Sequence, residues 1–362
     1  MNLHLGRVFF GLSVFMALIS VGCGSLGTST TGLGTAPTTE YVYVAHSQSH
    51  SLSSIAIPAN RTVSMVQIGN SSVGSATAQP SYPQDVVVSP DGKRAYVTDG
   101  VASVWVVDTG SNSVVAAVPA GGGPGKLVIS PDGKSVYVAT YLCGSVSCVA
   151  SVAVLDTGSN TLTSTIPVTK GVGANLSGIA VTPDGKRVYV AVSPGSDVAA
   201  IDTATNSIAE TIATTNSGNV DLSISPDGRH VYAAGWVKGL DLNTNFVDVI
   251  DTQTNEQSAA INLGYDDVPV RIAVTPDGSQ AFVTGDIGNI FVVDTVQKVL
   301  AGKVAVSSGN PLTGIAITPD GARMYVGCGN TNTIYVLSTS GSAVLDAISS
   351  NYPLGLTIHS AN

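Results

Sequence analysis

The sequence predicts an all-β fold, a seven-bladed β-propeller built from four-stranded antiparallel blades. The motif Ser/Thr-Pro-Asp-Gly occurs six times, with prolines at positions 90, 131, 183, 226, 276 and 319. These prolines are 41, 52, 43, 50 and 43 residues apart, which is close to the length of one four-stranded propeller blade. A seventh copy is divided between the two ends of the chain. The repeats therefore predict seven blades.

Residues 176–212 are one complete copy of the repeat. They divide into an apolar run that ends at Thr182 and three further runs at 187–192, 197–202 and 207–212. Each run is β-branched or aromatic and is bounded by Gly, Pro, Asn or Asp, which is typical of short strands joined by tight turns. Five copies also carry Asp-Thr after the third strand. Such an aspartate can hydrogen-bond backbone amides of the turn, so it needs no catalytic explanation.

Two short motifs resemble a known repeat family. Tyr96–Asp99 reads Tyr-Val-Thr-Asp, and Ile201–Asn206 reads Ile-Asp-Thr-Ala-Thr-Asn. On these motifs the chain is similar to the YVTN-type β-propeller repeat family over residues 40–362, and the resemblance implies the propeller fold. The repeat pattern also distantly resembles that of lactonase-like seven-bladed propellers, whose sites need a metal or an acid–base set at the channel mouth. One propeller architecture hosts many unrelated functions, so the resemblance does not fix an activity.

The N-terminus has the pattern of an exported lipoprotein. Residues 1–22 combine a positive start at Arg7 with an apolar run at 8–19, which is too short to span a bilayer but fits a signal peptide. The end of this segment resembles a bacterial lipoprotein processing site, at which Cys23 would be lipidated and would anchor the chain to a membrane of the cell envelope. The alternative is ordinary secretory cleavage nearby, with Cys23 incidental. The Gly/Ser/Thr-rich remainder of residues 23–39 predicts a flexible tether of about 20–25 Å.

The propeller, residues 40–362, is expected to begin in the middle of a blade. Residues 41–45, 52–57 and 62–68 read as second, third and fourth strands with no first strand before them. The missing strand is Leu354–His359 at the other end of the chain. We therefore expect the C-terminal strand to pair with the N-terminal strands and close the ring, which leaves no open sheet edge.

The first strand of each copy alternates between two faces. Branched residues are expected to pack between blades, and the alternate residues to face a narrow central channel. At one level of the channel these alternates are Asp85, Lys126, Gly178, Asp221, Arg271, Gly314 and Gly355. One interpretation is that the two acids and two bases neutralise one another in pairs, Asp85 with Lys126 and Asp221 with Arg271. The other is a binding site for a small polar or zwitterionic ligand.

Loop lengths indicate which face is functional. The Pro-Asp-Gly and Asp-Thr turns keep a nearly constant length on one face, whereas the segments on the other face vary, at 69–83, 141–149, 169–176, 235–245 and 264–269. Function usually lies on variable loops held by a rigid scaffold. Trp236 and Tyr265 are aromatic residues of these loops and are candidates for binding. The alternative is that each covers a local apolar surface.

One variable loop resembles the start of a calcium loop. Asp241, Asn243 and Asn245 place oxygen ligands at alternate positions, which can wrap a hard cation. The EF-hand pattern then fails at Phe246 and Thr252, so a polar hairpin loop is the simpler interpretation. We expect no cofactor, with calcium as the one candidate.

The cysteines outside the N-terminal segment predict one disulfide. Cys143 and Cys148 flank four residues at a hairpin tip, so a local bridge is expected in an exported protein. Cys328 has no evident mate and is expected to be a half-buried thiol of the seventh blade.

Catalytic motifs are scarce. The sequence has no G-x-S-x-G, H-E-x-x-H or P-loop motif. His46 and His50 are spaced to share a metal, but a polar surface loop is the simpler interpretation. For a lactonase-like site, the candidate contributors are Asp85, Asp221 and Arg271.

Composition narrows the function class. The net charge of −9 and the lack of a basic stripe argue against nucleic acid. The sequence is 11% charged and contains 40 glycines, which suits a turn-rich exported shell. We predict a monomeric, non-catalytic envelope lipoprotein that binds a protein, peptide or glycan of the envelope through its variable-loop face. The alternatives are a lactonase-like hydrolase at the charged channel mouth and a structural spacer without a specific ligand.

Overall fold

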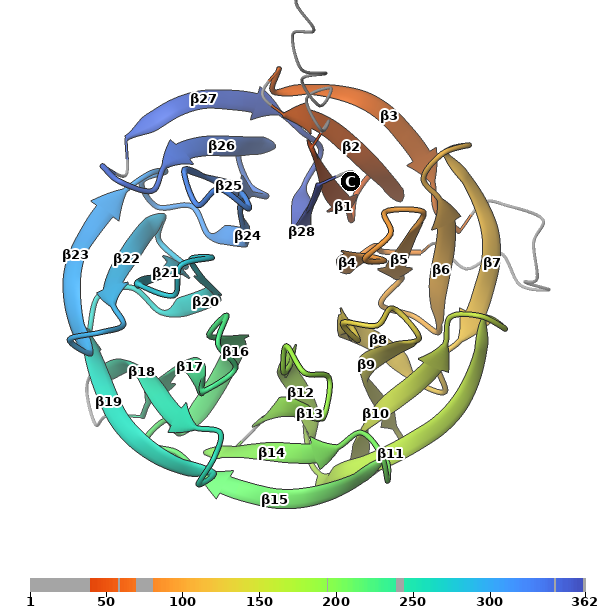
Figure 1. Cartoon of the computed structure of the whole chain (residues 1–362), viewed down its shortest axis with the longest axis horizontal. Coiled ribbons are helices and arrows are strands. Elements are labelled where there is room, and N and C mark those ends of the chain that lie inside the picture. Colours follow the sequence, from red (N-terminus) through yellow and green to blue (C-terminus); the bar gives the residue numbers. More distant parts are fainter. Residues whose placement is uncertain are drawn as a thin grey trace, which may run out of the picture. The chain divides into compact units, whose positions relative to one another are not determined.

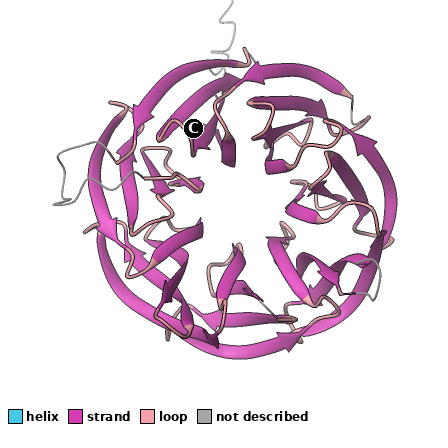
Figure 2. Cartoon of the chain, turned by 180° about the vertical axis from the view of Figure 1, so that it is seen from behind, coloured by secondary structure: helices cyan, strands magenta, loops and turns pink. Residues whose placement is uncertain are grey.

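Seven four-stranded sheets form a ring around a central channel (Figure 1). The computed structural model describes residues 40–57, 59–69, 81–193, 195–238, 244–341 and 343–360. The predicted signal peptide, Cys23 and the tether lie outside these residues. All regular structure in the described part is β-strand (Figure 2), and this part holds no helix that is long and apolar enough to cross a membrane. The predicted all-β, seven-bladed fold is confirmed.

Each blade is an antiparallel sheet, and its four strands follow one another in order from the channel to the outside of the ring. Blade 1 is β28-β1-β2-β3, and blades 2 to 7 follow in chain order. The innermost strands of blades 1 to 7 are β28 (Pro353–Ser360), β4 (Asp85–Val88), β8 (Gly123–Ile129), β12 (Asn175–Val181), β16 (Gly218–Ile224), β20 (Pro269–Val274) and β24 (Leu312–Ile317). The second strands are β1 (Glu40–His46), β5 (Arg94–Thr98), β9 (Ser135–Cys143), β13 (Arg187–Ser193), β17 (His230–Val237), β21 (Gln280–Gly285) and β25 (Arg323–Cys328).

The two outer strands of each blade complete the sheet. The third strands are β2 (Ser51–Ile57), β6 (Ser103–Asp108), β10 (Cys148–Asp156), β14 (Asp197–Asp202), β18 (Thr244–Asp251), β22 (Asn289–Asp294) and β26 (Thr333–Ser338). The outermost strands are β3 (Arg61–Gln67), β7 (Ser113–Pro119), β11 (Thr161–Gly171), β15 (Ser207–Ala213), β19 (Glu256–Gly264), β23 (Val299–Ala305) and β27 (Val344–Ser349).

The ring closes through the two ends of the propeller. Strand β28 pairs antiparallel with β1, with Val44 opposite Leu356, as the divided repeat predicted. Side chains reinforce the closure, because the Tyr325 hydroxyl of blade 7 donates a 2.7 Å hydrogen bond to Asn60 Oδ1 of blade 1. His46 contributes as well: its Nδ1 lies 3.2 Å from the Asn351 carbonyl oxygen. The first and last segments of the propeller are thus joined by backbone and side-chain contacts.

The hydrophobic core lies between neighbouring blades. Because successive residues of a strand point to opposite faces of its sheet, each blade supplies one apolar layer to each neighbour. The largest fully buried side chains include Tyr189, Tyr325 and Phe282, all on second strands. The buried tyrosines satisfy their hydroxyls across the blade boundary, as where Tyr189 donates to Asn255 Oδ1 at 2.8 Å.

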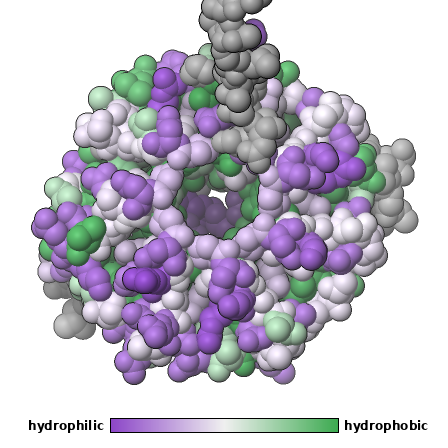
Figure 3. Space-filling view, viewed as in Figure 1, coloured by the Kyte–Doolittle hydropathy of each residue, from purple (hydrophilic) through white to green (hydrophobic). Residues whose placement is uncertain are grey.

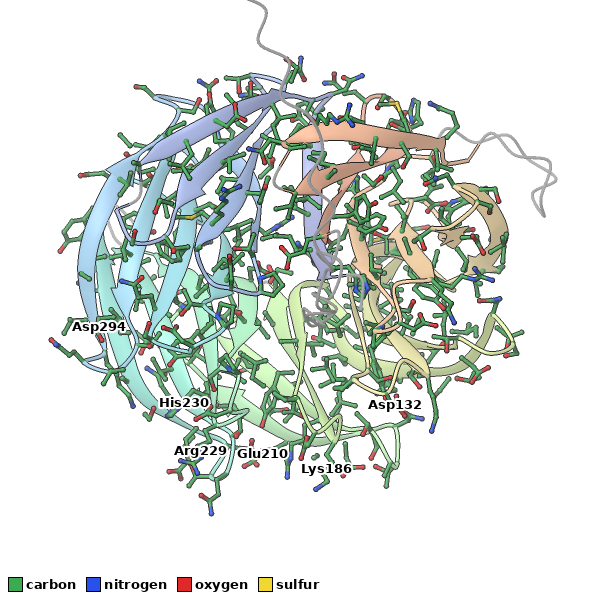
Figure 4. The ribbon with its side chains drawn as sticks, turned by 45° about the horizontal axis from the view of Figure 1, so that its top comes forward. Asp132, Lys186, Glu210, Arg229, His230 and Asp294 are labelled. Carbon is green, nitrogen blue, oxygen red and sulfur yellow. A yellow bond between two sulfur atoms is a disulfide. The ribbon has the colours of Figure 1, made fainter. Side chains whose placement is uncertain are left out.

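The face that carries the Pro-Asp-Gly turns is called the turn face, and the opposite face the loop face. In blade 4 the Thr182 hydroxyl and the Lys186 amide both donate to Asp184 Oδ1, at 2.6 and 3.0 Å. The Thr203 hydroxyl donates to the Gly185 carbonyl at 2.7 Å and ties the second turn of the blade to the first. Equivalent hydrogen bonds recur in other blades, so this face keeps constant loop lengths. Asp132, Lys186, Arg229 and His230 lie along one edge of the molecule, away from the channel (Figure 4).

The glycines of the innermost strands have a second role besides facing the channel. Gly314 and Gly355 line the inner part of the channel, as expected. A Cβ atom on Gly178 would lie 2.7 Å from the Leu222 backbone nitrogen of the next blade, and one on Gly355 would lie 2.5 Å from Asp85 Cα. These positions are glycine because neighbouring innermost strands pack directly against them.

Candidate functional site

The loop-face mouth of the channel holds a cavity of about 390 Å³, here called the mouth cavity. Below it a smaller cavity of about 150 Å³ continues into the channel. The mouth cavity is lined by Gln84, Asp85, Gly100, Pro124, Gly125, Lys126, Tyr141, Asn175, Leu176, Ser177, Val220 and Arg271. Hydrophilic residues are visible in the central hollow of the molecule (Figure 3). The volume suits a small molecule rather than a folded partner.

The four charged residues predicted from the strand pattern meet here. Asp85, Lys126 and Arg271 line both cavities, and Asp221 lines the inner one. They come from β4, β8, β16 and β20, so four blades contribute to one charged level. Burial lowers the pKa of Lys126, Arg271 lowers it further, and the two aspartates oppose this effect. The four charges therefore interact as one cluster.

Lys126 and Asp85 form the predicted ion pair. The Lys126 Nζ lies 3.4 Å from Asp85 Oδ2, and the two side chains are only 15% and 13% exposed. A pair so withdrawn from water is screened much less than a surface pair. It neutralises two of the four charges.

Asp221 and Arg271 do not form the second predicted pair. The Asp221 carboxylate instead accepts a 3.2 Å hydrogen bond from the Ile272 backbone amide, and burial raises the pKa of this carboxyl. The Arg271 guanidinium donates through Nη1 to the Val270 carbonyl at 3.2 Å, and its buried Nε has no partner. Among the described residues, no carboxylate lies within 4.0 Å of Arg271. One cation of the mouth thus has no acidic partner in direct contact.

Sequence reasoning missed several residues that line the mouth. Tyr141 stands at the end of β9, 40% exposed, beside the charged cluster. The variable segment 141–149 contained it, so its place at an insertion was the signal that could have singled it out. Gln84, Asn175 and Ser177 also line the mouth but carry no distinguishing sequence pattern.

Trp236 and Tyr265 do not join this cavity. The Trp236 ring lies against Gly218, where an added Cβ would be 2.8 Å from the ring, and it is partly buried. Tyr265 is 55% exposed. Its neighbour Asp267 is buried and accepts hydrogen bonds from the Ile287 amide and the Asn289 side chain. The two aromatic residues therefore lie outside the mouth cavity, and their binding role stays a prediction.

The metal predictions receive no geometric support from the described residues. Asp241 and Asn243 lie outside them, and Asn245 is fully buried with its amide donating to the Asp267 carbonyl. Calcium binding there stays a prediction. Within the described ranges, no group of three His, Cys, Asp or Glu side chains is arranged to hold a metal ion.

The two histidines of the first loop have separate partners. His46 is 2% exposed, and its Nε2 lies 2.6 Å from Ser53 Oγ. Burial lowers the pKa of His46 to about 4, so it is neutral near pH 7. His50 bonds to the Ser81 carbonyl through Nδ1 and packs edge-on against Tyr82. His46 and Ser53 are too deeply buried to meet a substrate and act in ring closure.

The cysteines follow the sequence prediction with one correction. Cys143 and Cys148 form a disulfide and are opposite each other in the β9–β10 hairpin. Cys328 is free, but it is fully buried rather than half-buried. It packs in the apolar layer between blades 6 and 7, which removes it from solvent.

The mouth cavity combines a charged floor with apolar and aromatic walls. Lys126 and Arg271 can stabilise negative charge on a ligand, and Asp85 can accept a proton or a hydrogen bond. Pro124, Tyr141 and Leu176 can contact the apolar part of the same ligand. This arrangement suits a small molecule with one polar or anionic end.

Comparisons with solved structures support the fold. The chain is similar to Kuenenia stuttgartiensis hydrazine synthase, with a TM-score of 0.71 and 21% identity over 83% of this chain and 92% of that one. A functionally unknown protein from Desulfotomaculum acetoxidans DSM 771 gives a TM-score of 0.70 and 17% identity, over 89% of this chain and 99% of that one. Dihydro-heme d1 dehydrogenase NirN, in complex with DHE, gives 0.58 and 18%, over 89% of this chain and 75% of that one. At these identities the likeness establishes the fold alone.

Sequence comparison identifies the family. No curated protein matches the chain. Residues 21–239 match the family described as "Lactonase, 7-bladed beta-propeller", and this match covers more than half of the 362 residues. Together with the seven observed blades, it shows that the chain belongs to the seven-bladed β-propeller lactonase family.

Proposed function

We propose that this propeller binds a small carboxylate at the loop-face mouth of its channel. The observation that carries the proposal is Arg271, which lines the mouth cavity and has no carboxylate within 4.0 Å among the described residues. Lys126, by contrast, already has Asp85 at 3.4 Å. A cation in a poorly hydrated site is stabilised by an anion, and a planar guanidinium matches a planar carboxylate.

The surrounding charge favours a carboxylate over a phosphate. Asp85 and Asp221 lie close enough to Lys126 to affect its pKa, so the site already contains two acids. A ligand with one negative charge is repelled less by these acids than one with two. The cavity of about 390 Å³ is large enough to hold a single-ring acid.

Titration of the purified protein with sodium acetate and with inorganic phosphate, followed by calorimetry at pH 7, tests this proposal. Acetate is expected to bind in the millimolar range and phosphate more weakly. Arg271→Gln should weaken acetate binding about tenfold, because it removes a charge-assisted hydrogen bond. Arg229→Gln is the matched control, since Arg229 is exposed on the turn face. Equal acetate affinity in the wild type and Arg271→Gln would overturn the proposal.

Lactone hydrolysis is a second candidate function. Membership of the lactonase family favours it, and so does the presence of Asp85 in the same cavity as Lys126 and Arg271. In this scheme Asp85 takes a proton from water as the water oxygen bonds to the lactone carbonyl carbon. Lys126 or Arg271 stabilises the charge on the carbonyl oxygen, and the ring C–O bond then breaks. The leaving oxygen recovers the proton from Asp85. The product is a hydroxy acid, which releases its carboxyl proton to the solvent and becomes a hydroxy carboxylate, the ligand class proposed above.

Ring opening of glucono-δ-lactone, followed with a pH indicator, tests the second candidate. The wild type should exceed the buffer rate, and Asp85→Asn should lower the catalysed rate about 100-fold. Asp227→Asn on the turn face serves as the control. A wild-type rate equal to that of buffer would exclude hydrolysis of this lactone as a function, and it would not affect the binding proposal.

We also propose that the protein is exported and lipid-anchored through Cys23. The Cys143–Cys148 disulfide supports an oxidising compartment. Radiolabelled palmitate incorporation that is lost in Cys23→Ala would support the anchor. Label retained in that variant would contradict it.

A further inference from the structure

We infer that Tyr141 is the specificity-determining wall of the mouth cavity and that it selects carboxylates carrying a ring over acyclic ones. The inference rests on the proposed carboxylate site, because it concerns the part of the same ligand that lies beyond the charged group. Tyr141 lines the mouth cavity together with Lys126 and Arg271. An aromatic face beside an anion site suits a flat or ring-shaped ligand body.

The backbone beneath the Tyr141 ring holds it in place. A Cβ atom added to Gly123 would lie 3.1 Å from Tyr141 Cζ, so the ring lies directly over this glycine. Gly123 and Tyr141 are also paired between β8 and β9. A Cβ on Gly122 would lie 2.7 Å from the Tyr141 carbonyl oxygen, so the glycine pair lets the two strands approach closely. The ring is thus supported on one side and remains 40% exposed.

The hairpin that carries Tyr141 is extended and cross-linked. Strands β9 and β10 each have nine residues, whereas the corresponding strands of blade 2 have five and six. Tyr141 therefore lies two residues beyond the position at which the second strand of blade 2 ends. The Cys143–Cys148 disulfide closes the hairpin two residues after Tyr141. A local cross-link restricts the freedom of the hairpin, and therefore of Tyr141, before a ligand binds.

The rest of the cavity is consistent with a ring at this position. Pro124 and Leu176 also line the cavity as buried apolar residues, and Gln84, Asn175 and Ser177 supply hydrogen-bonding groups. A ligand whose carboxylate meets Arg271 would place its body against these walls. An acyclic acid such as acetate is too small to reach them.

The experiment compares acetate, benzoate and cyclohexanecarboxylate by calorimetry on the purified protein. The wild type should bind both ring acids about tenfold more tightly than acetate. Tyr141→Ala should remove most of this preference, lowering the ratio of ring-acid to acetate affinity by about 3- to 10-fold. Tyr141→Phe should retain the preference, and Tyr265→Ala should not affect it, because Tyr265 is an exposed aromatic residue outside the cavity.

The cross-link has its own test. A Cys143→Ser/Cys148→Ser double variant should lower the benzoate-to-acetate affinity ratio by about 2- to 5-fold without changing acetate affinity, because only the position of Tyr141 is affected. Acetate binding with no preference for ring acids, or a preference that survives Tyr141→Ala, would overturn the inference and leave the proposed function intact. Failure of the wild type to bind any of the three acids would overturn the proposed function itself.

Discussion

The Lys126 ammonium group of blade 3 lies 3.4 Å from the Asp85 carboxylate of blade 2, and both side chains are more than four-fifths buried. The pair joins two neighbouring blades at the mouth of the channel. A charge that loses its partner in such a place keeps its desolvation cost without compensation. The pair is therefore part of the structure of the mouth as well as of its electrostatics.

A double-mutant cycle on this pair should show strong coupling. Lys126→Met leaves the Asp85 charge largely buried and unpaired, and we expect it to lower the free energy of unfolding by about 2–3 kcal/mol. The Asp85→Asn/Lys126→Met double variant should be less destabilised than the sum of the single variants. Urea unfolding at pH 7 measures all three. Additive losses would mean that the two groups do not interact.

The Tyr325–Asn60 hydrogen bond should stabilise ring closure. Asn60→Ala removes the acceptor of the buried Tyr325 hydroxyl and places alanine at a φ of 49°. It also removes an exposed 3.0 Å hydrogen bond from Asn60 Nδ2 to Asp346 Oδ2. These effects should together cost about 2–3 kcal/mol. Asn112→Ala is the matched control, because Asn112 has a φ of 51° but is exposed, and it should cost only about 1 kcal/mol. Equal losses in the two variants by urea unfolding would show that the hydrogen bond contributes nothing.

Close packing of the innermost strands makes Gly178 hard to replace. Gly178→Ala should lower stability by about 2 kcal/mol, because its Cβ would lie 2.7 Å from the Leu222 nitrogen and the two strands would have to move apart. Gly302→Ala should be nearly neutral, since nothing lies within 4 Å of a Cβ there. Thermal unfolding of the two variants measures the difference. Similar melting temperatures would contradict the packing argument.

His46 should make stability depend on pH. Its pKa is about 4 in the folded protein against an ordinary value of 6.5, so the unfolded chain takes up the proton first as pH falls. Neutral, buried His46 therefore contributes about 3 kcal/mol to the free energy of unfolding. This contribution is complete above about pH 6.5 and is lost as the pH falls towards 4. Burial raises the pKa of Asp248 to about 6, which acts in the opposite direction. The quantity to measure is therefore the difference in free energy of unfolding between the wild type and His46→Gln as a function of pH.

The expected difference has a definite sign. Between pH 7 and pH 4 the wild type should lose more stability than His46→Gln, so the two urea-unfolding curves should converge as pH falls. Parallel dependence on pH in the two proteins would show that His46 is not held neutral by burial.

The sequence predicted the blades because their signals are local. Pro-Asp-Gly turns, Asp-Thr turns and alternating strands are each set by a few adjacent residues, and strand β14 begins and ends at the predicted Asp197 and Asp202. Closure through Leu354–His359 was also predictable, because the divided repeat left one possible partner. The Pro-Asp-Gly turn occurs six times and the Asp-Thr turn five times, so a weak signal in one copy was supported by the others.

The site was predictable only in part, because its details depend on contacts between blades. The strand alternation placed Asp85, Lys126, Asp221 and Arg271 at one level, and the structure brings them to one mouth. The direction in which Arg271 extends, and the backbone amide that Asp221 meets, depend on packing that no single strand encodes. Tyr141 reaches the cavity only because β9 is long and the hairpin folds over Gly123.

The most direct test of the account is a map of ligand contacts. Backbone NMR spectra of the deuterated protein should be recorded with increasing benzoate at pH 7. We expect the shifted amides to cluster around Asp85, Lys126, Tyr141 and Arg271 at the mouth of the channel. Shifts centred on Trp236 and Tyr265, or no saturable shifts at all, would contradict the claim that the charged mouth is the functional site.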